Sequence, residues 1–270
     1  MVRDSHATIV CLQETKLDAV DDAIISATLG PNFTANYAVL PAIGTRGGMI
    51  LATSDAYFTL SDIHITQATL SGTVTMLSEG ITWTITCVYG PQRDQEKLAF
   101  IEELRGLKPM ARDAWLILGD FNLITKAADK NNLNTNRRLI GKFQAARDFL
   151  QLKDMRLGGR RFTWSNAQAD PVLTKIDHVF FSDEWDLIFP DTHLQAIGSA
   201  CSDHAPLLLQ GYVNAPRKTS FKFEEFWMRM PGFKETVAEA WNKHIQDTDP
   251  IRRIHIKLSR MAKALKKWQR

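Results

Sequence analysis

Long apolar runs are missing from this sequence: none approaches the roughly 18 residues that a membrane-spanning helix requires. The first six residues, Met1-Val2-Arg3-Asp4-Ser5-His6, lack the apolar stretch of a signal peptide. Internal repeats and low-complexity segments are absent as well. We therefore expect an intracellular protein with no membrane partner, and the nucleus is a candidate compartment.

Cysteine is also scarce. Cys11, Cys87 and Cys201 are widely separated and odd in number, so no disulfide framework or zinc-type spacing follows. Because Cys11 and Cys87 lie in apolar, strand-like runs, the sequence predicts that both are buried free thiols.

The overall composition is that of an ordinary globular protein: 270 residues, 44% hydrophobic and 23% charged. The net charge of +3 hides an asymmetry. Residues 217–270 hold 14 basic and 6 acidic residues, a net charge of +8, whereas residues 1–216 hold 19 and 24, a net charge of −5. An acidic body suits a site that gathers carboxylates around a cation, and a basic tail suits a polyanion partner.

Hydrophobic patterning predicts a mixed α/β fold. Expected strands are Ala7–Leu12, Thr34–Leu40, Gly48–Thr53, Tyr57–Ile65, Gly72–Leu77, Ile81–Tyr89, Trp115–Leu118, Ile176–Phe181, Leu194–Ile197 and Leu207–Val213. Expected helices are Asp18–Leu29, Glu96–Leu107 and Leu139–Leu150. This set predicts a two-layer β-sandwich flanked by helices. A doubly wound sheet is the less favoured alternative, because several connections are too short for parallel crossovers.

A domain boundary is expected at Asn214-Ala215-Pro216-Arg217. It separates a main domain, 1–215, from a basic helical tail, 216–270. In the tail, apolar residues recur at intervals of three and four: Ile251, Ile254, Leu258, Met261, Leu265 and Trp268. This seam is too short to predict a coiled coil and favours a helix that packs on its own domain or on further sequence.

Polar side chains with catalytic chemistry stand at or beside the ends of the expected strands. Glu14 follows the first strand and suits a hard cation, although a surface or helix-capping glutamate would look the same. Asp120 and Asn122 follow the strand Trp115–Leu118. Since residues two apart face the same side of an extended chain, both point together while Phe121 packs the other way. An Asp/Asn turn is the alternative.

Further candidates lie in two later segments. Asp177 is a carboxylate within an apolar run, where it needs a cationic or metal partner. Asp203 and His204 are adjacent in a loop before a strand, and histidine is the side chain best suited to act near neutral pH. A solvated turn is the alternative there. Tyr89 can contact a phosphate or be a rim aromatic, and Trp164 can stack on a base or pack in the core.

Taken together, these candidates form an oxygen-rich set, which suits Mg²⁺, or alternatively Mn²⁺, better than zinc.

The motifs resemble, in their order, those of the endonuclease/exonuclease/phosphatase family, which includes DNase I. They are Gln13-Glu14-Thr15, Tyr89-Gly90-Pro91, Gly119-Asp120-Phe121-Asn122, Ile176-Asp177-His178 and Ser202-Asp203-His204. The resemblance spans about residues 7–213 and implies a DNase I-like fold.

The resemblance also implies a role for each matching residue. Glu14 binds the metal, with Asp203 assisting. Asp120 orients or deprotonates the attacking water, and Asn122 hydrogen-bonds the phosphate. His204, held by Asp177, stabilises the transition state, and Tyr89 contacts the scissile phosphate.

Finer features are similar to the endonuclease domain of plant LINE-type non-LTR retrotransposons. They are Thr163-Trp164-Ser165-Asn166, Thr174-Lys175-Ile176-Asp177-His178 and the stretch 131–138. Trp164, Asn166 and Arg137 are the implied substrate-binding residues, and DNA is the implied partner. The basic tail resembles the linker towards a reverse transcriptase, but no reverse transcriptase is present in this chain.

One departure from the family pattern bears on activity. The family opens with a strand that carries a catalytic-site asparagine, whereas only six residues precede Ala7–Leu12. The chain thus resembles a truncated copy that lacks the first strand. Three functions follow: a DNA endonuclease that leaves 3′-hydroxyl nicks, a catalytically impaired retroelement remnant that at most binds nucleic acid, and a phosphomonoesterase of the same fold.

Overall fold

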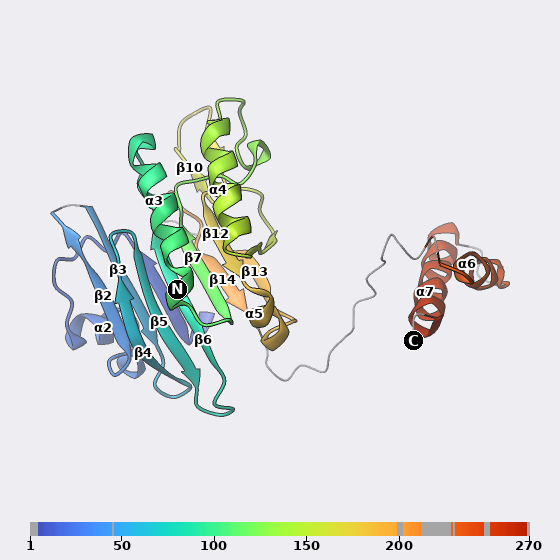
Figure 1. Cartoon of the computed structure of the whole chain (residues 1–270), viewed down its shortest axis with the longest axis horizontal. Helices are drawn as coiled ribbons and strands as arrows, with labels where there is room; N and C mark the ends of the chain where they lie inside the picture. The colour runs from blue at the N-terminus through green and yellow to red at the C-terminus, as the bar shows by residue number, and fades with distance from the viewer. Residues whose placement is uncertain are drawn as a thin grey trace. The chain divides into compact units, whose positions relative to one another are not determined.

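The computed structural model describes residues 5–44, 46–198, 202–211, 228, 230–245 and 249–268. They belong to two compact units, Met1–Asn214 and Ala215–Arg270 (Figure 1). The predicted boundary at residue 215 lies outside the described residues, and each unit is considered by itself.

A six-stranded sheet forms the centre of the first unit. Its strands, in spatial order, are β4 (Phe58–Ile65), β5 (Thr69–Met76), β6 (Thr82–Tyr89), β7 (Trp115–Asp120), β12 (Asp177–Phe181) and β8 (Lys153–Asp154). All neighbours are antiparallel except β6 and β7. A parallel pair needs a long crossover, which here contains helix α3 (Asp94–Gly106). The crossover brings the carboxyl ends of β6 and β7 to the same edge of the sheet.

The second layer consists of two three-stranded sheets. One has the order β1 (Ile9–Gln13), β3 (Arg46–Thr53), β2 (Tyr37–Ile43), and the other has the order β14 (Leu207–Gln210), β13 (His193–Ala196), β9 (Leu157–Gly158). Both contribute to one apolar core shared with the six-stranded sheet, which includes Met49, Leu51, Trp83, Ile85 and Leu194. A hairpin of β10 (Trp164–Ser165) and β11 (Leu173–Thr174) stands apart from these layers.

Helices cover the outer faces of the sandwich. On the six-stranded sheet, α3 and α4 (Arg137–Phe149) lie side by side (Figure 1) and bury Phe100, Leu104 and Phe143 against its outward-facing residues. On the other layer, α2 (Asp22–Thr28) and the 3₁₀ turn η1 (Pro31–Phe33) cover β1 and β3. The predicted sandwich is thus confirmed, and the doubly wound alternative is wrong because most strand pairs are antiparallel.

Several short elements escaped the sequence prediction. They are α5 (Asp183–Ile188), the strands β8 to β11, and the 3₁₀ turns η2 (Lys108–Met110) and η3 (Ala127–Asp129). Two-residue strands carry too few residues for a periodic signal. Helix α2 begins at Asp22 rather than Asp18, because the Asp21 side chain caps it by accepting a hydrogen bond from Ile24 N at 2.9 Å.

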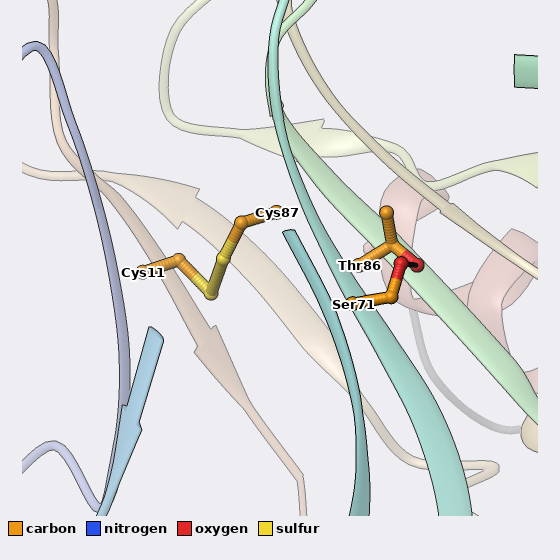
Figure 2. Close-up of a disulfide and its surroundings, with 4 residues drawn as sticks. All are labelled: Cys11, Ser71, Thr86 and Cys87. Carbon is orange, nitrogen blue, oxygen red and sulfur yellow. Dashed lines mark hydrogen bonds between the residues drawn. A yellow bond between two sulfur atoms is a disulfide. The ribbon is translucent and has the colours of Figure 1, made fainter. Parts of the chain in front are cut away.

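The predicted free thiols at Cys11 and Cys87 are wrong: the two residues form a disulfide bond. Figure 2 shows Cys87 pointing towards Cys11, while the neighbouring Thr86 points to the other face, where its hydroxyl hydrogen-bonds Ser71 at 2.8 Å. The two cysteines come from the facing layers of the sandwich, 76 residues apart in sequence. Cysteine spacing alone cannot reveal such a pair. Cys201 lies outside the described residues.

The second unit is a pair of helices, α6 (Phe233–Asn242) and α7 (Pro250–Trp268). The predicted apolar seam lies on α7, where Leu265 is fully buried and Trp268 packs edge-on against Phe233. Towards the start of α7 the seam is uncovered, and Ile251 is 79% exposed. None of the helices described in either unit has the length and apolar character that a membrane span requires.

Replacing both Cys11 and Cys87 by serine is expected to lower the free energy of unfolding by roughly 2–5 kcal/mol, because the disulfide closes a long loop in the unfolded chain. Chemical denaturation with and without dithiothreitol measures this. The reductant should destabilise the wild-type protein and leave the double variant unchanged. Equal sensitivity of the two proteins to the reductant would contradict the disulfide.

Candidate active site

Three adjacent strands of the central sheet end together and present polar side chains at one edge. In the parallel register of β6 and β7, Tyr89 is the partner of Asp120. In the antiparallel register of β7 and β12, Asp120 is the partner of Asp177. Asp120 is only 5% exposed and Asp177 only 9%. Strand pairing therefore holds two largely buried carboxylates and a phenol next to one another.

Asp120 and Asn122 do point together, as predicted, but the cause is a tight turn. Asn122 has a left-handed backbone with φ of 50°. This allows its main-chain N–H and its side-chain amide to donate to the two Asp120 carboxylate oxygens, at 2.8 and 2.9 Å. The amide also donates to the Gly90 carbonyl at 2.9 Å. Phe121 packs into the core on the opposite side, as expected.

Close backbone contact between the strand ends depends on glycine. A Cβ at Gly119 would overlap the Val88 backbone, and a Cβ at Gly90 would overlap the Phe121 carbonyl. Gly119 also has a φ of +137°, which side chains disfavour. These two glycines let β6 and the turn after β7 approach closely enough for the Asn122–Gly90 hydrogen bond.

His204 and Asp177 form an ion pair within this group. The imidazole Nδ1 lies 2.9 Å from one Asp177 oxygen and 3.2 Å from the other. On its other side, Nε2 lies 4.0 Å from an Asp120 oxygen. The imidazole thus stands between the two carboxylates, with its Nε2 directed to the side where Asp120 lies.

Thr163 holds Asp177 in place, a role that the sequence analysis did not assign. Its hydroxyl, 2% exposed, accepts hydrogen bonds from the main-chain N–H groups of Ile176 and Asp177, both at 3.1 Å. Its position beside Trp164 within one motif was the only available signal, because a buried threonine has no distinctive sequence pattern.

Trp164 has a contact that the sequence did not predict, and its base-stacking role stays a prediction. Its indole N–H donates to the Asp203 carboxylate at 2.8 Å, and its backbone forms a bridge with His204. Trp164 therefore fixes the loop that carries both Asp203 and His204. Neither of the two earlier alternatives, stacking on a base or packing in the core, accounts for this hydrogen bond.

Glu14 reaches the same edge of the sandwich from the other layer. It follows β1 in a left-handed conformation, with φ of 53°. The Tyr89 hydroxyl donates a hydrogen bond to its carboxylate. The disulfide joins the same two strands nearby: Cys87 lies two residues before Tyr89, and Cys11 lies three residues before Glu14. The structure thus brings together seven predicted site residues, which we call the catalytic group: Glu14, Tyr89, Asp120, Asn122, Asp177, Asp203 and His204.

The two remaining substrate-binding candidates lie differently. The Asn166 side-chain oxygen accepts a hydrogen bond from Val172 N at 2.9 Å and so closes the loop of the β10–β11 hairpin. Arg137 is an exposed residue at the start of α4. No contact joins Arg137 to the catalytic group among the residues that the structure describes, so its substrate role stays a prediction.

The electrostatics of the group are unusual. Burial, followed by the neighbouring Asp177 carboxylate, raises the pKa of Asp120 to about 7. Burial alone would lower the pKa of His204, but its hydrogen bond to Asp177 and the surrounding carboxylates outweigh this and raise it to about 9. Burial and the bond to Glu14 raise the pKa of Tyr89, which keeps the phenol protonated as a donor. Asp120 is therefore the group that changes charge near neutral pH.

The donor set fits a hard divalent cation. Glu14 and Asp203 offer carboxylate oxygens. Glu14 also adds to the raised pKa of Asp120, and a cation at Glu14 would offset the repulsion between these two carboxylates. Among the described residues no cluster of three or more His, Cys, Asp or Glu side chains forms a ready-made cage. Mg²⁺ needs none, because it commonly keeps several waters and binds through one or two carboxylates.

Chemically, the group combines a base, a cation and several donors. Ionised Asp120 can take a proton from water, and protonated His204 can stabilise a negatively charged group. The Tyr89 hydroxyl and the Asn122 amide, which here donate to Glu14 and to Asp120 and Gly90, can reach a phosphate only by exchanging one of these hydrogen bonds. This combination suits water attack on an anionic phosphoester.

Comparison with known proteins agrees with this chemistry. Residues 1–204 match the sequence pattern of the Endonuclease/Exonuclease/phosphatase family. No curated protein sequence matches this chain at a significant level.

Solved structures share the fold. One is the 3′ phosphatase NExo from Neisseria bound to a product DNA hairpin; it is 18% identical, has a TM-score of 0.58, and the match covers 76% of this chain and 89% of that one. Another is the endonuclease domain of TRAS1, a telomere-specific non-LTR retrotransposon; it is 11% identical, has a TM-score of 0.56, and the match covers 79% of this chain and 90% of that one. A third is D. rerio TDP2 with a single-strand DNA product; it is 16% identical, has a TM-score of 0.52, and the match covers 76% of this chain and 86% of that one.

In metal-free protein, the Asp120 carboxyl is expected to titrate near pH 7, so it is protonated below and ionised above that value. Carboxyl ¹³C NMR measures this directly. Adding Mg²⁺ should lower the pKa, because a cation favours the carboxylate. The His204→Gln variant should raise it further, because the imidazolium favours the carboxylate as well. An Asp120 pKa near 4 in the metal-free protein would contradict the burial and repulsion described above.

Proposed function

Because the chain belongs to the endonuclease/exonuclease/phosphatase family, we propose that it is a metal-dependent phosphodiesterase that acts on DNA as an endonuclease and leaves 3′-hydroxyl ends. The observation that carries the proposal is the arrangement of His204 between the buried carboxylates of Asp120 and Asp177. Family membership alone supports phosphoester hydrolysis, and the choice of a DNA diester goes beyond it.

In this proposal a water molecule attacks the phosphorus atom of the diester. Asp120 accepts a proton from that water as the new oxygen–phosphorus bond forms. The bond between phosphorus and the 3′ oxygen breaks, and the departing oxygen takes a proton from solvent. The products are a 3′-hydroxyl and a 5′-phosphate. His204, kept protonated by Asp177, faces the charge that develops on the phosphate oxygens.

The remaining residues position the phosphate. Asn122 and Tyr89 donate hydrogen bonds to its oxygens, each in exchange for a bond described above: Tyr89 for its bond to Glu14, and Asn122 for one of its two side-chain bonds. The phenol stays protonated because its pKa is raised. Glu14 would hold Mg²⁺ or Mn²⁺, with Asp203 assisting through the carboxylate oxygen that does not bond Trp164. When bound, the cation would polarise the phosphate and offset its charge.

The DNA substrate and the retroelement origin have separate support. The relatives with bound DNA and the retrotransposon endonuclease domain share only the fold with this chain, at 18% identity or less. The LINE-like stretches 131–138, 163–166 and 174–178 and the basic tail favour DNA over a small phosphomonoester. We also propose that the protein acts inside the cell, with the nucleus as the candidate compartment.

Asp120→Ala is expected to reduce Mg²⁺-dependent nicking of supercoiled plasmid by about 10²–10⁴-fold, because the general base is lost. Gel analysis of nicked product measures the rate, and extension by a DNA polymerase detects the 3′-hydroxyl ends. Arg112→Gln, beyond the opposite end of β7, is the matched control and should nick normally. Nicking that persists in Asp120→Ala would contradict this mechanism. Phosphate release from monoesters without nicking would favour the phosphomonoesterase instead.

Trp164→Phe keeps an aromatic ring but removes the indole N–H that holds Asp203. If Trp164 acts by fixing this loop, the variant should need about tenfold more Mg²⁺ for half-maximal nicking. This factor is the lower end of the loss in metal affinity that follows removal of a group that orients a metal ligand. Titration of the nicking rate with Mg²⁺ tests this. An unchanged Mg²⁺ requirement together with weaker DNA binding would support base stacking instead.

A further inference from the structure

A pocket in the first unit has a strongly basic lining. It is bounded by α4, by β8 and the turn after it, and by η3, and its cavity volume is about 500 Å³. Six cationic side chains line it: Lys126, Arg147, Arg156, Arg160, Arg161 and Lys175. We refer to it as the basic pocket. These six residues are spread over 50 positions of the chain, from Lys126 to Lys175, so no sequence motif predicts the basic pocket.

The two acidic residues of the basic pocket are already engaged. One Asp129 oxygen accepts three hydrogen bonds, from the main-chain N–H groups of Thr125 and Lys126 and from the Thr125 hydroxyl, at 2.7–3.1 Å. Asp154 pairs with Lys175 at 3.0 Å. The six cationic side chains outnumber these two carboxylates, so the lining of the basic pocket carries a net charge of +4 (six minus two).

The remaining cations differ in their partners, and Arg147 pairs with Asp148 at 2.8 Å. No carboxylate lies within ion-pair distance of Arg156, Arg160 or Lys126 in the described part of the chain. The Arg161 guanidinium donates to the Ala128 carbonyl at 2.8 Å and lies over the Phe162 ring at 5.1 Å. Several guanidinium groups around one cavity match the oxygens of a phosphate, which they can bind in pairs of hydrogen bonds.

Two chain segments connect the basic pocket to the catalytic group. Arg161 precedes Trp164 by three residues, which span at most about 11 Å of extended chain, and Lys175 precedes Asp177 by two, at most about 7 Å. Successive phosphates of one DNA strand are about 3.4 Å apart along the helix axis. These limits place residues of the basic pocket close enough to the catalytic group for one polynucleotide strand to contact both.

We propose that the basic pocket binds a backbone phosphate of a polynucleotide whose neighbouring phosphodiester lies at the catalytic group. The inference rests on the proposed function and deepens it, because it defines the substrate as a polymer. A small phosphomonoester would occupy only the catalytic group and would leave the basic pocket without a ligand.

The test compares two double variants of the full chain. Arg156→Gln with Arg160→Gln removes two unpaired charges from the basic pocket. Arg105→Gln with Arg112→Gln is the control, since Arg112 precedes β7, at the end of the strand opposite Asp120, and Arg105 lies near the carboxyl end of α3. Thermal unfolding should show that both remain folded.

Binding of a fluorescein-labelled 30-base-pair DNA is measured by anisotropy in EDTA over a series of salt concentrations. Loss of the two arginines that bind one phosphate should weaken binding about tenfold and reduce the slope of log K against log salt by about 0.9. The control should match the wild type. Unchanged affinity and slope in the Arg156/Arg160 variant would overturn the proposal, as would loss of inorganic pyrophosphate binding in that variant without any change in DNA binding.

A second measurement separates this inference from the proposed function. Bis(p-nitrophenyl) phosphate carries a single phosphate and has none left for the basic pocket. Its hydrolysis should therefore be equal in the wild type and the Arg156/Arg160 variant, whereas KM for DNA should rise in the variant. If the wild type hydrolyses neither substrate, the proposed function fails, and the binding data still decide the basic pocket. An equal loss of activity on both substrates would contradict a separate polymer-binding site.

Discussion

The antiparallel pairing of β7 with β12 places Asp120 directly opposite Asp177, and the rest of the site depends on this register. Two carboxylates largely removed from water repel each other, and neither is stable there alone. The chain offsets this with three groups: His204 lies against Asp177, the Asn122 turn donates two hydrogen bonds to Asp120, and Thr163 anchors the start of β12. Asp120 keeps a raised pKa nonetheless, which leaves a deficit of positive charge that a metal ion would fill.

Each layer of the sandwich supplies part of the group. The central sheet gives Tyr89, Asp120 and Asp177, whereas Glu14 comes from the facing sheet and meets Tyr89 by a hydrogen bond. The Cys11–Cys87 disulfide ties these same two strands together just before both residues. Because Glu14 would hold the cation and Asp120 would activate the water, the spacing between the layers controls whether metal and base act on one phosphate.

The sequence predicted the strand-end residues well, because local rules place them. An acid or amide that directly follows an apolar run stands at a strand end, and Phe121 between Asp120 and Asn122 identified the buried side. Contacts between segments far apart in the sequence could not be predicted and became visible only in the fold. Trp164 and Asp203 are 39 residues apart, and the disulfide pairs cysteines 76 apart. The basic pocket has the same origin, since Lys126, Arg156 and Arg160 are brought together only when β8 joins the edge of the sheet.

The most direct measurement of the central claim is anomalous diffraction from crystals soaked in Mn²⁺, which replaces Mg²⁺ at oxygen-rich sites. A manganese peak at the Glu14 carboxylate, absent from crystals of the Glu14→Gln variant, is the predicted result. A peak elsewhere, or none at that edge of the sheet, would contradict the assignment of Glu14 as the metal ligand of a metal-dependent phosphodiesterase.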